Sequence, residues 1–190
     1  MINSVMLVFA RVRPVVGLLF AGIAFAGLTT APQARADSDT ARIAMGLKIA
    51  PVPLNLTGLS KNQVGLGSYL VTVAACNGCH TTPEFAPGSD PFQGDPKTAV
   101  VKTAYFAGGI NFGNGICSAN ITRDKNGLPD GLTLAHFLSA MHTGHDFRAP
   151  AKQLLVAMPW PYFRDMTDDD LTAIYTYLKA IPANKTPKCP

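Results

Sequence analysis

The sequence has few cysteines, few basic clusters and only one long apolar stretch. Each of these features excludes some classes of protein. Four cysteines occur in 190 residues, and only Cys76 and Cys79 are close together. Lysine and arginine gather on no segment, which argues against a nucleic-acid-binding surface. After residue 28 no apolar run approaches the roughly 18 residues that span a bilayer. Internal repeats are absent too, so we expect one soluble domain after any leader is removed.

The first 36 residues have the order of a secretory signal peptide. Arg11 and Arg13 form a basic start, an apolar run follows at 15–28, and residues 34–36 have the small-x-small pattern Ala-Arg-Ala. The competing interpretation is a membrane anchor, but about 14 apolar residues are too few to span. We therefore expect cleavage after Ala36, export to the periplasm, and no membrane span in the mature chain.

Cleavage would also remove most of the net charge. The chain has 16 basic and 12 acidic residues. Residues 1–36 contain three arginines and no acid, so 13 basic residues would remain against 12 acidic ones. A net charge of about +1 predicts no strong electrostatic steering toward a partner.

Capping signals and prolines divide the mature chain. Residues 37–59 are predicted to be an extended N-terminal arm, because Pro51 and Pro53 push the residues before them out of helical conformation. Residues 60–190 form the predicted domain, with helices that begin after Ser60, Thr133 and Thr167. The first is expected at 61–75, and the second at 134–143, where Gly144 closes it. The last carries three aspartates in its first turn and stops before Pro182.

Between these helices, residues 81–129 are mostly loop. One short hairpin is possible within 106–122, where glycines are frequent. A loop this long inside a compact domain needs something to organise it, and a large prosthetic group would do so.

The stretch Cys76-Asn77-Gly78-Cys79-His80 carries the clearest chemistry. Two thiols three positions apart can form thioethers with a haem, and the next histidine can ligate its iron. A zinc site would need a second ligand pair, and His142 with His145 would leave His80 unexplained. A redox dithiol would need a strand-helix-strand frame, which the sequence does not show. The pattern favours one covalently attached haem c.

The sixth position of the iron has several candidates. Met158 lies in "AMPWPYF", where flanking prolines stiffen the backbone, and Trp160 is its neighbour in the expected cofactor pocket. The competing interpretation is that Met158 merely packs beside Trp160. Met141 and Met166 suit structural roles better, Met45 comes too early in the chain, and the histidines at positions 142 and 145 are expected to be solvated. His136, on the expected helix at 134–143, stays unassigned.

Taken together, these motifs resemble a class I cytochrome c, and particularly the single-haem cytochromes that accompany bacterial periplasmic dehydrogenases. The matching segments are "GSYL", "CNGCHTTP", "FAGG", "NIT", "FLSAMHTG", "MPWPYF" and "MTDDDLTAIYTYL", within about residues 65–182. The resemblance implies an all-α fold in which N- and C-terminal helices cross near Gly67 and Tyr177, around one covalently attached haem. It implies thioethers at Cys76 and Cys79 and axial ligands at His80 and Met158. At "MHTG" the sequence departs from relatives, which commonly have a basic residue before the glycine, so we assign that helix no docking role.

Two cysteines remain outside the pentad. Cys117 and Cys189 are a disulfide candidate, because an oxidising compartment disfavours idle thiols. Such a bond would fasten the C-terminal tail to the central loop. The alternative makes Cys117 a thiolate haem ligand in a sulfur-oxidising enzyme.

The sequence thus favours an electron carrier with a redox-protein donor and a redox-protein acceptor, and not an enzyme in its own right. Two alternatives stay open. One is a catalytic haem subunit, for example of a sulfur-compound dehydrogenase, with an open or labile sixth position. The other is a secreted thiol oxidoreductase.

Overall fold

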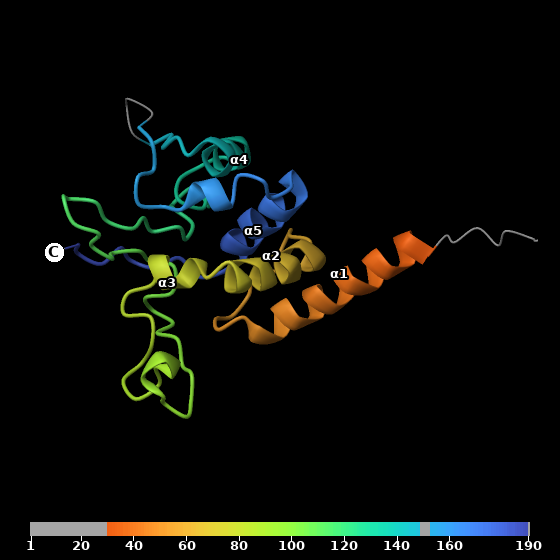
Figure 1. Cartoon of the computed structure of the whole chain (residues 1–190), viewed down its shortest axis with the longest axis horizontal. Coiled ribbons are helices and arrows are strands. Elements are labelled where there is room, and N and C mark those ends of the chain that lie inside the picture. Colours follow the sequence, from red (N-terminus) through yellow and green to blue (C-terminus); the bar gives the residue numbers. More distant parts are fainter. Residues whose placement is uncertain (1–29, 149–152, 190) are drawn as a thin grey trace, which may run out of the picture.

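The structure is a computed structural model that describes residues 30–148 and 153–189. Over these residues the chain is helical, with isolated β-bridges and no extended strand. This agrees with the predicted all-α class. The element order, shown in Figure 1, is α1 (Thr30–Ile49), α2 (Lys61–Val73), α3 (Cys76–His80), the short 3-10 helix η1 (Pro91–Gln93), α4 (Leu134–Thr143), the 3-10 helix η2 (Trp160–Tyr162) and α5 (Asp168–Ala180).

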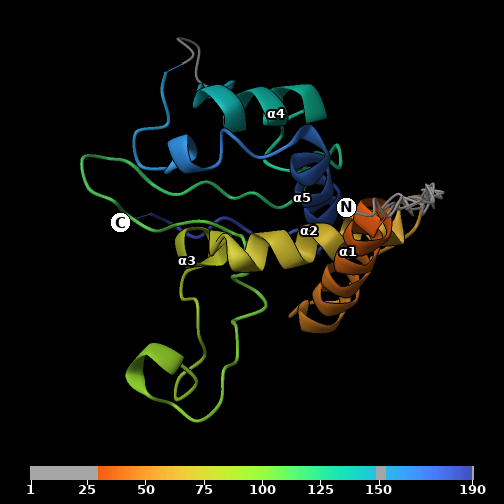
Figure 2. The same cartoon turned by 45° about the vertical axis from the view of Figure 1, so that its right-hand side comes forward.

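Helix α2 is the centre of the arrangement, with α1 on one side and α5 on the other (Figures 1 and 2). The crossing with α5 is close at Gly67, where a Cβ would lie 2.7 Å from the Cβ of Tyr177 and 2.6 Å from the carbonyl carbon of Ala173. Any side chain at this position would separate the helices. The predicted crossing near Gly67 and Tyr177 is therefore confirmed.

The buried core lies along this crossing. Tyr177, Leu171 and Leu178 of α5 are fully buried against Val64 and Val71 of α2. The loop before α4 closes the core from another side. Its Phe106 is also fully buried, and the hydroxyl of Tyr105 lies 3.0 Å from that of Tyr177. The core thus reaches from the terminal helix to the long loop.

The predicted extended arm at 37–59 is wrong for its first half, because residues 37–49 belong to α1. Gly46 of α1 meets Gly65 of α2, where a Cβ would lie 2.7 Å from the carbonyl oxygen of Ile43. The hydroxyl of Ser68 donates to the carbonyl of Gly46 at 2.8 Å. This packing against α2 stabilises α1, and the prolines that follow only end the helix. Residues 50–59 are irregular, as expected.

The N-terminal leader falls largely outside the described residues. Residues 1–29 are not described, and α1 begins at Thr30, ahead of the expected cleavage site at Ala36. Signal cleavage stays a prediction. In the part of the chain that the structure describes, no helix is both long and apolar enough to cross a membrane.

The predicted helix caps are confirmed. The side chains of Ser60, Thr133 and Thr167 each accept a hydrogen bond from a backbone amide of the helix that follows. Gly144 closes α4 with a φ of +71°. Helix α2 ends at Val73, two residues earlier than predicted, because Ala75 adopts a left-handed conformation with a φ of +53°.

The long central loop is held by short-range turns and a disulfide. Residues 83–101 project as a lobe below α3 in Figure 2, closed by an antiparallel bridge between Phe85 and Val100. A second bridge joins Asn111 to Cys117, within the region where a hairpin was expected. Cys117 is bonded to Cys189, with 6.2 Å between their Cα atoms. The C-terminal tail is thereby fixed on this loop.

Candidate functional site

The cysteine pair lies on its own helical turn. The left-handed conformation of Ala75 separates α2 from α3. The five residues of α3 include Cys76, Cys79 and His80. Both thiols are free, whereas the other two cysteines form the disulfide. Cys76 packs against the hydrophobic core, and burial raises the pKa of its thiol to about 12. The thiol is therefore neutral, unlike the low-pKa cysteine of a redox dithiol.

The ring of His80 is fixed by the backbone of the central loop. Its Nδ1 lies 2.8 Å from the carbonyl oxygen of Ala119, and a carbonyl can only accept. Nδ1 must therefore carry the hydrogen, which leaves Nε2 as a lone-pair donor. Burial lowers the pKa of His80, with a smaller contribution from the charge of Arg148. A neutral, oriented imidazole is the form that binds a metal ion.

The loop segment behind His80 is itself anchored. The amide of Gly108 donates to the carbonyl of His80 at 2.7 Å, and Thr81 and Gly108 form a parallel bridge. The hydroxyl of the buried Thr81 accepts from the amide of Phe106 at 3.1 Å. Residues 106–119 thus hold both the backbone and the ring of His80.

The donor set of this turn fits a haem c. Two free thiols stand three positions apart, and the adjacent imidazole has one nitrogen committed and one available. Among the residues described by the structure, no group of three or more His, Cys, Asp or Glu side chains is placed to hold a metal ion. This disfavours the zinc interpretation, which needs four converging ligands. Cys76 and Cys79 are the residues that would hold the haem, and His80 the one that would ligate its iron.

Met158 lies on a segment fastened to the end of α4. The amide of Leu155 donates to the carbonyl of Gly144 at 2.7 Å, and the amide of Trp160 donates to the carbonyl of Met158 at 2.8 Å. The indole of Trp160 lies directly against the α-carbon of Gly144, so closely that only glycine fits there. Met158 is half-buried and packs at the edge of the core. Its role as an iron ligand stays a prediction, as does a cofactor contact for Trp160.

The three remaining histidines have different surroundings. The ring of His136 stacks on Phe147 with centroids 4.8 Å apart. The exposed His145 has its Nδ1 3.1 Å from the hydroxyl of Thr143. His142 was expected to be solvated, and its side chain is 33% exposed; the structure adds partners that the sequence did not signal. Both of its nitrogens are in hydrogen-bond contact, one with the carbonyl of Arg164 and the other with the carboxylate of Asp168.

A charged cluster that sequence reasoning missed joins two loops. Arg148 contacts the carboxylate of Asp146 through Nε at 2.8 Å and Nη2 at 2.9 Å, and its Nη1 lies 2.5 Å from Asp130. Burial raises the pKa of Asp130 to about 7, although the guanidinium of Arg148 opposes the shift. Aspartates spaced 16 residues apart give no sequence signal for a shared partner.

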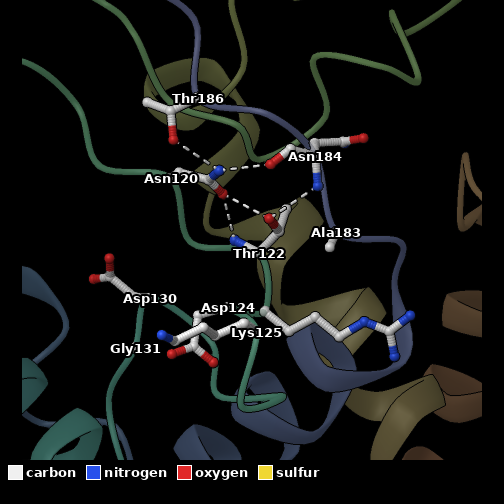
Figure 3. Close-up of a pocket in the computed structure, with 10 residues that line it drawn as sticks. Asn120, Thr122, Asp124, Lys125, Asp130, Gly131, Ala183, Asn184 and Thr186 are labelled. Carbon is white, nitrogen blue, oxygen red and sulfur yellow. Dashed lines mark hydrogen bonds between the residues drawn. The ribbon is translucent and has the colours of Figure 1, made fainter.

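The open pocket drawn in Figure 3 has a volume of about 480 Å³ and lies where the tail crosses the central loop. The amide of Asn120 donates to the carbonyl of Asn184 at 2.8 Å and to the hydroxyl of Thr186 at 3.0 Å. Thr122 joins the same network through the side chain of Asn120 and the amide of Asn184. These groups satisfy one another, so the network anchors the tail.

Comparison with known proteins gives two relatives of one kind. The chain is 28% identical over 152 residues to the fructose dehydrogenase cytochrome subunit of Gluconobacter japonicus, covering 77% of this chain and 27% of that subunit. It is 29% identical over 114 residues to the cytochrome c subunit of a quinone-type alcohol dehydrogenase of Gluconobacter oxydans, covering 58% of this chain and 20% of the relative.

This chain therefore resembles cytochrome subunits of dehydrogenases. It spans only about a quarter of the length of the curated relatives that it matches. No protein-family profile and no solved structure matches it. The similarity agrees with the donor set on α3.

The disulfide bears on one alternative that the sequence left open, the role of Cys117 as an iron ligand. Cys117 was considered as a thiolate ligand of the iron, but its sulfur is bonded to Cys189. A disulfide sulfur has no thiolate to offer. This argues against Cys117 as an iron ligand, whereas the alternative of a catalytic haem subunit with an open or labile sixth position does not depend on that residue.

Proposed function

We propose that this chain is a periplasmic c-type cytochrome with one haem, of the class I fold, and that it carries single electrons between a dehydrogenase-type donor and a respiratory acceptor. The observation that carries the proposal is the α3 turn, where two free thiols precede a histidine whose Nδ1 is committed to the backbone. The similarity to cytochrome subunits of dehydrogenases supports it. On this proposal the chain is a carrier and not itself an enzyme.

When bound, the haem supplies one-electron chemistry. The chain's own residues hold and tune it. Cys76 and Cys79 attach the group covalently, which prevents its loss in a compartment outside the cell. His80 presents Nε2 in one orientation, because the carbonyl of Ala119 fixes the opposite nitrogen. An oriented ligand that moves little between oxidation states favours rapid electron transfer.

Met158 is the proposed sixth ligand. A thioether fills the last coordination position, raises the reduction potential and leaves no site for a substrate. The support is the position of the residue, half-buried on a segment stiffened by Pro159 and braced by Trp160 against Gly144. With Cys117 in a disulfide, Met158 has no sulfur competitor from the tail or the central loop.

The donor and acceptor are proposed to be redox proteins that meet the chain transiently. A net charge near +1 after signal cleavage gives little long-range steering. The proposal therefore includes association rates that depend only weakly on salt concentration.

The absorption spectrum of the purified protein, produced with its haem-attachment machinery, tests the proposal. Covalently attached haem should remain with the polypeptide under denaturing conditions. Replacing both cysteines of α3 by alanine should abolish this retention of haem. In the oxidised state, a weak far-red band reports iron bonded to methionine sulfur. We expect Met158→Ala to lose this band, while Met45→Ala, in which an exposed methionine changes, retains it.

Two results would contradict parts of the proposal. A protein without covalently bound haem would refute the cytochrome assignment altogether. A wild type that lacks the far-red band and binds carbon monoxide readily when reduced has an open or weakly held sixth position. That outcome would favour the catalytic alternative and overturn the carrier role.

A further inference from the structure

His142 has a bonding pattern that only its charged form can satisfy. Its Nδ1 lies 2.6 Å from the carbonyl oxygen of Arg164, and its Nε2 lies 2.8 Å from Oδ1 of Asp168. A backbone carbonyl and an ionised carboxylate both accept and neither donates. A neutral imidazole has one hydrogen and can serve one of them. The imidazolium has two and serves both.

These two bonds join separate parts of the fold. His142 is in the last turn of α4, Arg164 is six residues beyond Met158, and Asp168 opens α5. The segment from 153 to 168 is thus fastened to α4 at both of its ends. Before Met158, the amide of Leu155 donates to the carbonyl of Gly144; beyond it, the ring of His142 makes the attachment.

We propose that His142, as an imidazolium, is a positioning residue that holds the Met158 segment on α4 and makes the iron–methionine bond depend on pH. The inference rests on the proposed function, since it assigns a consequence to Met158 as a ligand. It concerns a residue that touches neither the haem thiols nor the methionine. Its effect passes through Arg164 and Asp168 and through the backbone between them and Met158.

The surroundings of His142 support the charged form. The carboxylate of Asp168 is the largest cause that raises the pKa of His142, the carbonyl of Arg164 is the second, and Asp165 adds a smaller effect. No acid lies on α4, and the guanidinium of Arg164 is directed to Asp165, with its Nε 3.7 Å from Oδ1. Asp165 and Asp168 are therefore the titratable groups that face the ring.

The direction of the pH effect follows from linkage. A histidine whose pKa is raised in the folded state stabilises the fold fully below its ordinary value of about 6.5. The stabilisation is lost as the pH rises through the folded value. We therefore expect the Met158 segment to be tightly held in mild acid and to loosen in mildly alkaline solution.

The test follows the far-red band of the oxidised protein as a function of pH, with the His142 ring titrated by NMR in the reduced, diamagnetic protein. In the wild type, the two midpoints should coincide. Asp168→Asn should lower both midpoints, because it removes the carboxylate that raises the pKa of His142. Asp169→Asn is the matched control: it removes the same charge from the same exposed helical turn without touching the ring.

Two histidine substitutions separate charge from shape. His142→Arg keeps a permanent charge and several donors, so the band should persist above the wild-type midpoint. His142→Gln has no charge, and its band in mild acid should resemble that of the wild type in alkali. His145→Gln, a change at an exposed histidine three residues away, should behave like the wild type.

The outcomes distinguish this inference from the proposed function. If the band is present and Asp168→Asn and Asp169→Asn shift its midpoint equally, His142 is not the group that controls it. The same conclusion follows if His142→Gln leaves the pH profile unchanged. A wild type without the band at any pH, but with a His142 ring that titrates above its ordinary value, would refute Met158 as the ligand and with it the pH control proposed here.

Discussion

Replacing Gly67 by alanine tests the closeness of the α2–α5 crossing. The added Cβ would lie 2.6 Å from the carbonyl carbon of Ala173 and 2.7 Å from the Cβ of Tyr177, with the carbonyl oxygen of Ala173 nearer still. These atoms belong to the backbone of α5 or to its first side-chain carbon, so no rotamer change relieves the contact. Carbon atoms pack at about 3.5–4.0 Å, and the two helices would have to separate by roughly 1 Å.

The magnitude comes from two opposing effects. Alanine in place of glycine stabilises a helix by about 1 kcal/mol. Overpacking a core commonly costs about 1–3 kcal/mol, and contacts with rigid backbone on a fully buried face put Gly67 at the upper end. We expect a net loss of about 2 kcal/mol in the free energy of unfolding. For a domain of this size, the melting temperature should fall by roughly 4–8 °C.

Thermal and urea unfolding, followed by circular dichroism, measure this loss. Gly78→Ala is the control, because it makes the same change in helix α3, where the only atom within 4 Å of the new Cβ is Oε2 of Glu84 at 3.9 Å. The haem content of both variants should be matched before comparison. If Gly67→Ala is as stable as the wild type, the helices do not approach as closely as described, and the explanation of this glycine is wrong.

Three further predictions concern the loops and a cap. Replacing both Cys117 and Cys189 by alanine removes a bond across 72 residues and should destabilise the protein by up to about 4 kcal/mol; a reductant should lower the wild-type melting temperature equally and leave the variant unchanged. Arg148→Ala leaves the carboxylate of Asp130 buried without its partner and should cost about 1–3 kcal/mol at neutral pH. Burial raises the pKa of Asp130 to about 7 although Arg148 opposes the shift, so removing Arg148 should raise this pKa further, and the deficit of the variant relative to the wild type in urea unfolding should grow as the pH rises above 7; a deficit that stays constant across neutral pH would contradict this. Thr167→Ala should lower the unfolding free energy by about 1 kcal/mol, because an amide of α5 loses its acceptor, whereas Thr167→Ser should be close to neutral.

Local signals predicted the helices that begin with a side-chain cap. Ser60, Thr133 and Thr167 each start a helix where expected, because the cap and the first apolar residues lie within one turn. Helix α1 was not predicted from such a signal. Its stability comes from the fit of Gly46 on Gly65 across the interface with α2, and a contact between residues so far apart in sequence cannot be read from either segment alone.

In the candidate site, too, local features were predicted from the sequence and long-range contacts were not. The spacing of Cys76, Cys79 and His80 is a local pattern, so the sequence alone placed them on one turn. The acceptor of the His80 ring is Ala119, a backbone group that any residue could supply, and no side chain signals it. The partners of His142 were missed for a similar reason, since one is a carbonyl and the other looks like an ordinary aspartate in a helix's first turn.

The disulfide has a consequence for the integrity of the chain. Cys117 and Cys189 close a covalent ring that contains α4, α5 and the whole Met158 segment, while the haem-attachment turn precedes the ring. A protease that cuts one peptide bond anywhere inside the ring produces two fragments that still travel together. The nicked protein would run as one coloured band on a non-reducing gel and would separate into a coloured N-terminal piece and a colourless C-terminal piece only after reduction.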